Sequence, residues 1–205
     1  MTYDTLASAD AVERAMKALT ERGMLPEAVP TGAAALARIK ELIPAGASLM
    51  NGSSRTLEQI GFIDLLKAGG HGWNNLHDGV LAETDPAKKA RLRKEAVLSD
   101  FYLGSAHAIA ETGEIVIASN SGSQMPHLVY TSPNLILVVS TQKVMPTLDD
   151  AIARLKTHVY PQEDARLKEL GMGGSFISKM LVLNREPSFM GRKFHVILVG
   201  EKLGF

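Results

Sequence analysis

Two stretches of this sequence carry residues that could do chemistry, and each adjoins a run typical of a β-strand. The first is Asn51-Gly52-Ser53-Ser54, which precedes a segment of helical character beginning at Arg55. Backbone N–H groups at a helix start, supported by hydroxyls, can hold a phosphate or a carboxylate. The alternative is that Ser53 or Ser54 only caps its helix. We predict an anion site here, with Asn51 to Arg55 as candidate ligand-binding residues.

The second stretch runs from Phe101 to Ser140 and contains a carboxylate among small and hydroxyl-bearing residues. Glu111 precedes an aliphatic run, where it could act as a general base or as a nucleophile toward an activated acyl group. Alternatively, Glu111-Thr112-Gly113 is a turn with a solvated carboxylate, and the sequence alone favours that structural role. If the chain is an enzyme, Glu111 is the candidate catalytic residue. The surrounding loops add candidate ligand-binding residues: Gly104, Ser105, Thr112, Ser121, Gly122 and Ser123.

Regular secondary structure must hold these candidate residues in place. The aliphatic runs Ile115–Ala118 and Leu135–Val139 predict two strands of such a framework. Neither run alternates apolar with polar residues, and both are rich in β-branched residues. This pattern is typical of strands covered on both faces, as in a largely parallel sheet between helices. Further strands are predicted at 47–50, 180–183 and 196–199. The fold class is therefore α/β, a layered and mostly parallel sheet flanked by helices.

Loops that leave the carboxyl ends of neighbouring parallel strands share one rim of the sheet. We therefore expect Ser105, Ser121 and Ser123 to converge on the same cleft as the segment 52–54. Capping residues mark the helices around this sheet: Asp10, Thr31 and Thr147 each precede a helical pattern. The prolines at positions 26 and 30 indicate a break between the first two helices. A strongly basic helix follows Asp85-Pro86, and we interpret its charges as a solvated flank.

Composition limits the function classes. A chain of 205 residues fits one sizeable α/β domain, with residues 1–30 as an N-terminal helical extension. Lys plus Arg and Asp plus Glu number 22 each, so the charge balance does not suggest a nucleic-acid partner. The absence of cysteine excludes a cysteine nucleophile and cysteine-ligated iron–sulfur clusters within the chain. We expect no membrane span, no metal site and no cofactor, and a cytoplasmic location.

Several short motifs together resemble the LUD domain, the lactate-utilisation protein C family. The segment Ala108–Gly113 is similar to the family's Ala-Ile-Ala-acidic-Thr-Gly segment before a strand. Pro133 with the following strand, the connection Lys143-Val144-Met145 and the run His195–Val199 also resemble the family, in the right order between about 31 and 200. The resemblance implies the fold shared by ribose-5-phosphate isomerase, CoA-transferases and methenyltetrahydrofolate synthetase. CoA-transferases of that superfamily use a glutamate as acyl acceptor, which is why Glu111 is singled out.

The chain also departs from the family pattern. Asn134 stands where many relatives have a histidine, and Phe189-Met190-Gly191 replaces a His-Gly-Pro segment. Many relatives carry Gly-Pro-Ser and then an acidic pair, where this chain has Gly173-Gly174-Ser175 and, near the acidic position, Lys179. Lys179 joins the candidate ligand-binding residues. Chemistry that depends on the missing histidines or acids cannot be carried over.

The resemblance implies a role in the use of lactate or a similar organic acid, with a small anionic metabolite as ligand. Its partners would be flavin- or iron–sulfur-containing subunits that oxidise lactate to pyruvate, this chain being an accessory subunit. Two alternatives stay open: a stand-alone enzyme acting on a sugar phosphate or CoA thioester, and a non-catalytic interaction subunit. Whether the chain is an enzyme, and whether it forms a homo-oligomer, are not decided by the sequence.

Overall fold

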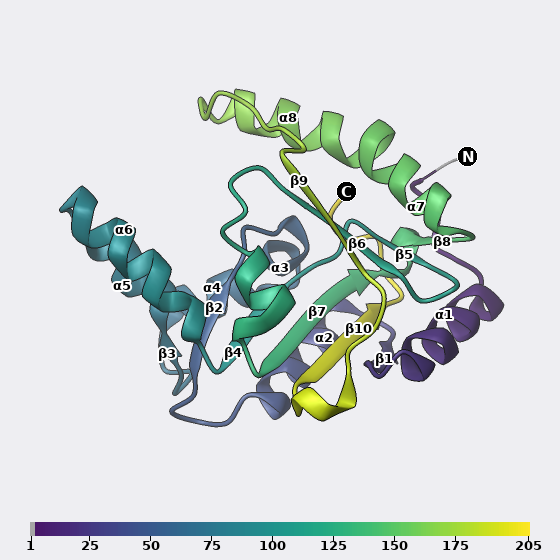
Figure 1. The fold of residues 1–205 in the computed structure, drawn as a ribbon, viewed down its shortest axis with the longest axis horizontal. Coiled ribbons are helices and arrows are strands. Elements are labelled where there is room, and N and C mark those ends of the chain that lie inside the picture. Colours follow the sequence, from purple (N-terminus) through teal and green to yellow (C-terminus); the bar gives the residue numbers. More distant parts are fainter. Residues whose placement is uncertain (1–2) are drawn as a thin grey trace.

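A six-stranded parallel sheet forms the centre of the molecule in a computed structural model that describes residues 3–205 (Figure 1). Every neighbouring pair in it runs parallel. This confirms the predicted α/β layered fold. In spatial order its strands are β1 (Leu25–Val29), β10 (Lys193–Val199), β7 (Asn134–Ser140), β4 (Phe101–Gly104), β2 (Ser48–Asn51) and β3 (Asn74–Asn75).

A second, four-stranded sheet lies against the first. Its spatial order is β8 (Val144–Met145), β5 (Ala108–Ala110), β6 (Ile115–Ser119) and β9 (Lys179–Leu183). Strand β6 pairs antiparallel with both of its neighbours. The sequence prediction that placed residues 115–118 in a parallel sheet is therefore wrong. Both faces of β6 are covered, so the apolar/polar alternation that usually marks an antiparallel strand is absent.

Helices cover both sheets. Those ahead of β4 are α1 (Ala9–Glu21), α2 (Gly32–Leu42), α3 (Arg55–Gln59), α4 (Phe62–Ala68), α5 (Leu76–Ala82), α6 (Pro86–Glu95) and the 3₁₀ turn Ala96–Leu98. Later ones are the π-helical turn His127–Thr131, the 3₁₀ turn Thr141–Lys143, α7 (Leu148–Arg154), the π-helical turn Leu155–Val159, α8 (Tyr160–Glu169) and the 3₁₀ turn Ser188–Met190. Figure 1 shows α7 and α8 above the small sheet, and α5 and α6 at one side of the molecule.

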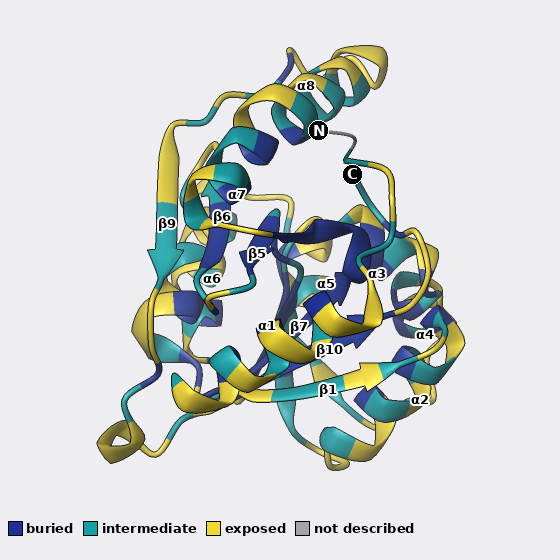
Figure 2. Ribbon diagram, turned by 90° about the vertical axis from the view of Figure 1, so that its right-hand side faces the viewer, coloured by how far each residue is buried: buried dark blue, intermediate teal, exposed yellow. Residues whose placement is uncertain are grey.

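Three apolar clusters fix the order of the layers. Figure 2 shows buried segments in the interior of the molecule. Successive residues of β7 point to opposite faces. Leu135 and Leu137 pack with α1 and the small sheet, whereas Ile136 packs with α2, α3 and α4. The far face of the small sheet, including Val116, packs against α7 and the turn after it. The layers are therefore helices, main sheet, small sheet and helices.

Local sequence explains where most helices begin. Thr31 and Thr147 accept hydrogen bonds from the N–H groups three residues later, as predicted. Helix α1 begins earlier than predicted, because Ser8 rather than Asp10 is its cap. The segment predicted as a break at Pro26 is strand β1. It lies at the edge of the sheet, where a proline without an N–H is tolerated.

Residues before position 30 contribute to the main sheet as well as to a helix. Strand β1 pairs with β10 along its length, and α1 packs on the same sheet. The division into one domain with an N-terminal helical extension stays a prediction. Within residues 3–205, no helix combines the length and apolar character needed to cross a membrane.

The turn after α1 generates a test of the packing. Gly23 has φ +82°, and a Cβ there would collide with the carbonyl oxygen of Glu186. Gly46 has φ +81° with nothing within 4 Å of the added atom. We expect Gly46→Ala to cost about 1 kcal/mol of unfolding free energy and Gly23→Ala about 3 kcal/mol, since only the latter adds a clash. Urea denaturation of both variants would measure this. Equal losses of unfolding free energy in the two variants would show that the turn at Gly23 shifts away from Glu186 at no extra cost.

Candidate functional site

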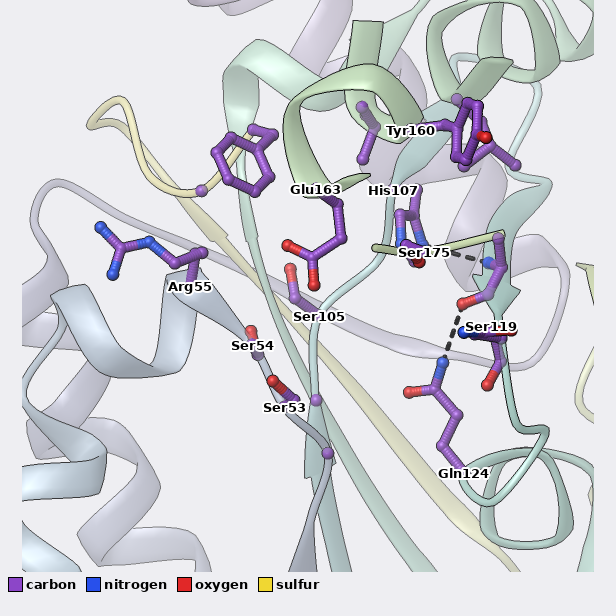
Figure 3. A pocket seen from close by; sticks show the side chains of 18 of the residues that line it. Ser53, Ser54, Arg55, Ser105, His107, Ser119, Gln124, Tyr160, Glu163 and Ser175 are labelled. Atoms are coloured by element: carbon purple, nitrogen blue, oxygen red, sulfur yellow. Dashed lines mark hydrogen bonds between the residues drawn. The ribbon is translucent and has the colours of Figure 1, made fainter. Parts of the chain in front are cut away.

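A cavity of about 490 Å³ opens at the carboxyl ends of three adjacent strands of the main sheet (Figure 3). Its floor consists of the segments that follow these strands. Residues 52–56 follow β2, residues 104–107 end and follow β4, and Lys143 lies just after β7. Ligands of open α/β sheets bind at this edge, because loops from neighbouring strands meet there. The volume suits a small organic molecule.

The wall opposite the floor is largely apolar. It comes from the helical turn after α7, from α8, from the chain between α8 and β9, and from the segment after β10. Its apolar members are Leu155, Val159, Tyr160, Leu167, Met172, Phe176, Ile177 and Phe205. A ligand in the cavity would therefore meet polar groups on the floor and hydrocarbon on the opposite wall.

The loop after β6 forms a third side and is held by its own hydrogen bonds. Ser119 Oγ accepts from the N–H of Gly122 at 2.9 Å, and Gln124 Nε2 donates to the carbonyl of Ala118 at 2.9 Å. The Tyr102 hydroxyl donates to Gln124 Oε1 at 3.1 Å and lies close to Gly52, where an added Cβ would approach it to 2.5 Å. Figure 3 shows Ser119 and Gln124 across the cavity from Ser53 and Ser54.

Lys143 lies at the bottom of the cavity and is only 4% exposed. Its Nζ donates to Thr56 Oγ1 at 3.1 Å, to Ser105 Oγ at 3.3 Å and to the carbonyl of Ala106 at 3.3 Å. These are neutral partners. Burial, with a smaller contribution from the positive charge of Arg154, lowers the pKa of Lys143 to about 7.

Two more basic side chains lie close to this lysine. Burial and the charges of Lys143 and Arg154 lower the pKa of His107 to about 3, so this imidazole is neutral at physiological pH. His107 Nδ1 accepts from the N–H of Ala118 at 3.2 Å, which leaves the proton on Nε2. Arg154 is fully buried and donates to the His107 carbonyl at 2.6 Å, while its Nε and Nη2 have no partner among the described residues.

No carboxylate of the described residues pairs directly with these charges, although the negative charge of Asp4 acts on Arg154 from a distance. Within residues 3–205, neither Lys143 nor Arg154 forms an ion pair. Glu163 lines the cavity, but both of its oxygens accept hydrogen bonds from Arg166 at 2.8 Å. A buried charge without a partner is costly, so an anion entering here would gain from pairing with it.

The structure brings eight of the predicted ligand-binding residues to this cavity. They are Gly52, Ser53, Ser54, Arg55, Gly104, Ser105, Ser121 and Ser123. Two details limit the predicted anion site. The N–H of Gly52 donates to the carbonyl of Leu103, so it is not free for a ligand. Ser54 Oγ accepts from the N–H of Leu57 and thus caps α3, which was the alternative interpretation.

The other predicted residues do not line the cavity. Asn51 is buried beneath it and donates to the Gly52 carbonyl. Gly122 and Lys179 lie at its margin, where the Lys179 amine approaches the carbonyl of Asn120 at 3.4 Å.

Glu111 and Thr112 form the tight turn between β5 and β6, away from the cavity. Glu111 Oε2 accepts from Arg14 Nε of helix α1 at 2.6 Å, and the carbonyl of Thr112 accepts from Arg22. The turn closes with a hydrogen bond from the N–H of Gly113 to the carbonyl of Ala110 at 2.8 Å. The turn matches the structural alternative, but its carboxylate is paired with Arg14 instead of being solvated, and Glu111 does not line the cavity.

Lys143 and His107 are the main residues that the sequence analysis did not select. Lys143 appears there only within a connection that resembles the family, and His107 is not among the candidates. One signal could have identified Lys143: it is a lysine a few residues after an uninterrupted aliphatic strand, at the carboxyl edge of the sheet. In the described residues, no group of three or more His, Cys, Asp or Glu side chains has the arrangement of a metal site.

The fold and the cavity define an α/β protein with a small-molecule-sized site at the carboxyl edge of a parallel sheet. The model of the LUD domain matches residues 12–199, and the chain belongs to this family. Among solved structures, it is similar to a DUF162 family protein from Deinococcus radiodurans, with a TM-score of 0.54 and 14% identity. That similarity covers 95% of this chain and 99% of the other, and at this identity it supports the fold alone. No curated protein matches the sequence.

The buried lysine makes stability depend on pH. Its pKa falls from 10.5 to about 7 on folding, so between these values the unfolded chain holds a proton that the folded chain lacks. Stability therefore rises with pH across this window, by at most about 1.4 kcal/mol per unit from this group. We expect the unfolding free energy of the wild type to rise from pH 7 to pH 9 relative to that of Lys143→Met. Parallel urea titrations measure it, and identical slopes would mean that Lys143 stays protonated in the fold.

Proposed function

We propose that this LUD-domain protein binds a small anionic metabolite in the cavity at the carboxyl edge of the main sheet. The observation that carries the proposal is the positive charge near its floor without a carboxylate partner. Lys143 and Arg154 are both buried and outside any ion pair of the described residues. A carboxylate or phosphate would supply the missing counter-charge.

The cavity offers such an anion several hydrogen-bond donors besides the amine. The Ser53 and Ser105 hydroxyls line the floor, and the neutral His107 can donate through Nε2. The apolar wall, including Val159 and Phe176, would cover the hydrocarbon part of the ligand. A short organic acid has both features, a carboxylate at one end and an apolar remainder.

Family membership supports a role in the utilisation of lactate or a related organic acid. In this proposal the protein serves as an accessory component of the oxidation of lactate to pyruvate. The oxidation itself belongs to flavin- or iron–sulfur-containing partners, since this chain has no cysteine to ligate a cluster. Binding of the organic acid would then influence how this protein assembles with the oxidising partners or how it controls them.

The test is a thermal-shift screen of the wild type with lactate, pyruvate, sugar phosphates, CoA esters and folates. A ligand at about 100 times its dissociation constant adds about 2.7 kcal/mol of stability, which moves the melting temperature measurably. We expect small organic acids to stabilise the protein. A response only to sugar phosphates or CoA esters would favour a stand-alone enzyme, and no response to any compound would leave an interaction subunit.

The charge argument makes a sharper prediction for whichever anion is found. Lys143→Met keeps the approximate shape of the side chain and removes the amine. We expect the affinity for the anion to fall at least tenfold, about 1.4 kcal/mol, because the remaining donors are neutral or lie deeper. Glu111→Gln serves as the control and should bind as the wild type does, since Glu111 lies outside the cavity. Isothermal titration calorimetry gives both values, and an unchanged affinity of Lys143→Met would reject the proposed site.

Proton uptake provides an independent check of the same assignment. At pH 8 the amine is mostly neutral in the free protein, given its pKa of about 7. A bound anion favours the charged form, so binding should take up protons from the buffer. Calorimetry in two buffers of different ionisation enthalpy would show this for the wild type and not for Lys143→Met. Equal proton uptake by the two proteins would mean that another group titrates on binding.

A further inference from the structure

Lys143 has the setting of an amine nucleophile as well as that of an anion anchor. It is the only buried lysine among residues 3–205, and it lies on a cavity of about 490 Å³. Its position is fixed, because it ends the 3₁₀ turn that follows β7 and donates to oxygens from two other segments. A primary amine that is buried, fixed and adjacent to a ligand-sized cavity can form a covalent bond to a carbonyl group.

An amine attacks a carbonyl carbon only through its free lone pair, so it must lose its proton first. Burial and the charge of Arg154 favour the neutral form of Lys143, as described above. Desolvation next to another cationic group is one of the ways in which proteins activate a lysine for this reaction. Exposed lysines such as Lys179 lack this environment.

Two hydroxyl groups beside the amine can move protons. Thr56 Oγ1 lies 3.1 Å from Lys143 Nζ, Ser105 Oγ lies 3.3 Å from it, and the two hydroxyl oxygens are 3.3 Å apart. Both residues also line the cavity. A hydroxyl can accept and donate in one step, so this pair can carry a proton from the attacking nitrogen to the carbonyl oxygen.

The charge of the product selects the substrate class. A protonated Schiff base is stabilised by a nearby anion. Glu163 is the one acidic side chain among the described residues that line the cavity, and it already accepts two hydrogen bonds from Arg166. The substrate must therefore bring its own carboxylate. In a 2-oxo acid this group is bonded to the carbonyl carbon, so it lies next to the nitrogen as soon as the bond forms.

We propose that Lys143 forms a Schiff base with the carbonyl carbon of a 2-oxo acid bound in the cavity. The amine lone pair attacks this carbon, the C–N bond forms, and the π electrons of the carbonyl move to its oxygen. Ser105 or Thr56 relays a proton from nitrogen to that oxygen, which gives a carbinolamine. The hydroxyl then takes the remaining proton of the nitrogen through the same pair of hydroxyls and leaves as water while the C=N bond forms. The imine nitrogen takes up one proton from solvent to reach its protonated form. The balance is amine plus ketone to imine plus water, and nothing is oxidised or reduced.

This inference rests on the proposed function, because the 2-oxo acid is the anion that enters the cavity. It adds a distinction between two related acids. Lactate has a hydroxyl in place of the carbonyl, so it can bind only without a covalent bond. Pyruvate has the carbonyl and can do both.

The experiment is reductive trapping. The wild-type protein is incubated at neutral pH with pyruvate and sodium cyanoborohydride, which reduces an imine to a stable secondary amine. Intact-mass spectrometry counts the adducts, and peptide mapping locates them. We expect one adduct, on the peptide that contains Lys143, and no adduct when lactate replaces pyruvate.

Two variants serve as matched controls. Lys143→Arg keeps a basic side chain without a primary amine and should lose the adduct, whereas Lys179→Arg removes an exposed lysine at the cavity margin and should keep it. Ser105→Ala should slow trapping at least several-fold without moving the adduct. Labelling spread over surface lysines and unchanged in Lys143→Arg would overturn the proposal.

The outcomes also separate this inference from the proposed function. Thermal stabilisation by both pyruvate and lactate, with no adduct from pyruvate, would refute the Schiff base and leave the anion site intact. An adduct on Lys143 combined with stabilisation would support both. Neither stabilisation nor an adduct would reject both.

Discussion

The amine of Lys143 joins the parts of the molecule that form the site. Its hydrogen bonds reach Thr56, in the helix after β2, and Ser105 and Ala106, in the segment after β4. Lys143 itself follows β7, so one side chain connects the ends of three adjacent strands of the main sheet. Because all its partners are neutral, the connection is weaker than an ion pair and leaves the charge open to a ligand.

The second sheet explains why such a charge can be kept from water. Strands β5 and β6 lie across one face of the main sheet, and α7 covers their far side. Arg154, the last residue of α7, is thereby fully buried and donates to the carbonyl of His107. Its charge acts on both His107 and Lys143 through a medium that screens poorly. The two-sheet architecture therefore determines the protonation of the site as well as its shape.

Much of the main sheet could be predicted from sequence, because its strands are continuous aliphatic runs and its helices carry recognisable caps. The run at 135–139 and the caps Thr31 and Thr147 are examples. The antiparallel pairing of β6 could not be predicted, since burial on both faces gives Ile115, Val116 and Ile117 the same pattern as a parallel strand. Strand β1 was hidden by Pro26, which only an edge position tolerates.

The serine-rich loops of the cavity were easier to predict than its charged centre. Ser53, Ser105 and Ser121 stand in loops after strands, and the parallel arrangement of β2 and β4 alone brings the first two together. The significance of Lys143 and Arg154 depends instead on burial without a direct ion-pair partner among the described residues. A single sequence does not show which basic side chains lack such a partner.

Glu111 is the opposite case, a residue that the sequence suggests for catalysis and that the structure places outside the cavity. Its sequence context resembles that of an acyl-accepting glutamate, but the residue that follows β5 leads into a hairpin turn toward Arg14 of helix α1. An amino acid of suitable chemistry becomes a candidate for catalysis only when the topology brings it to the cavity. Here the topology brings an amine and hydroxyls there, and the proposed imine formation uses these groups, whereas acyl transfer to Glu111 would need a carboxylate that does not line the cavity.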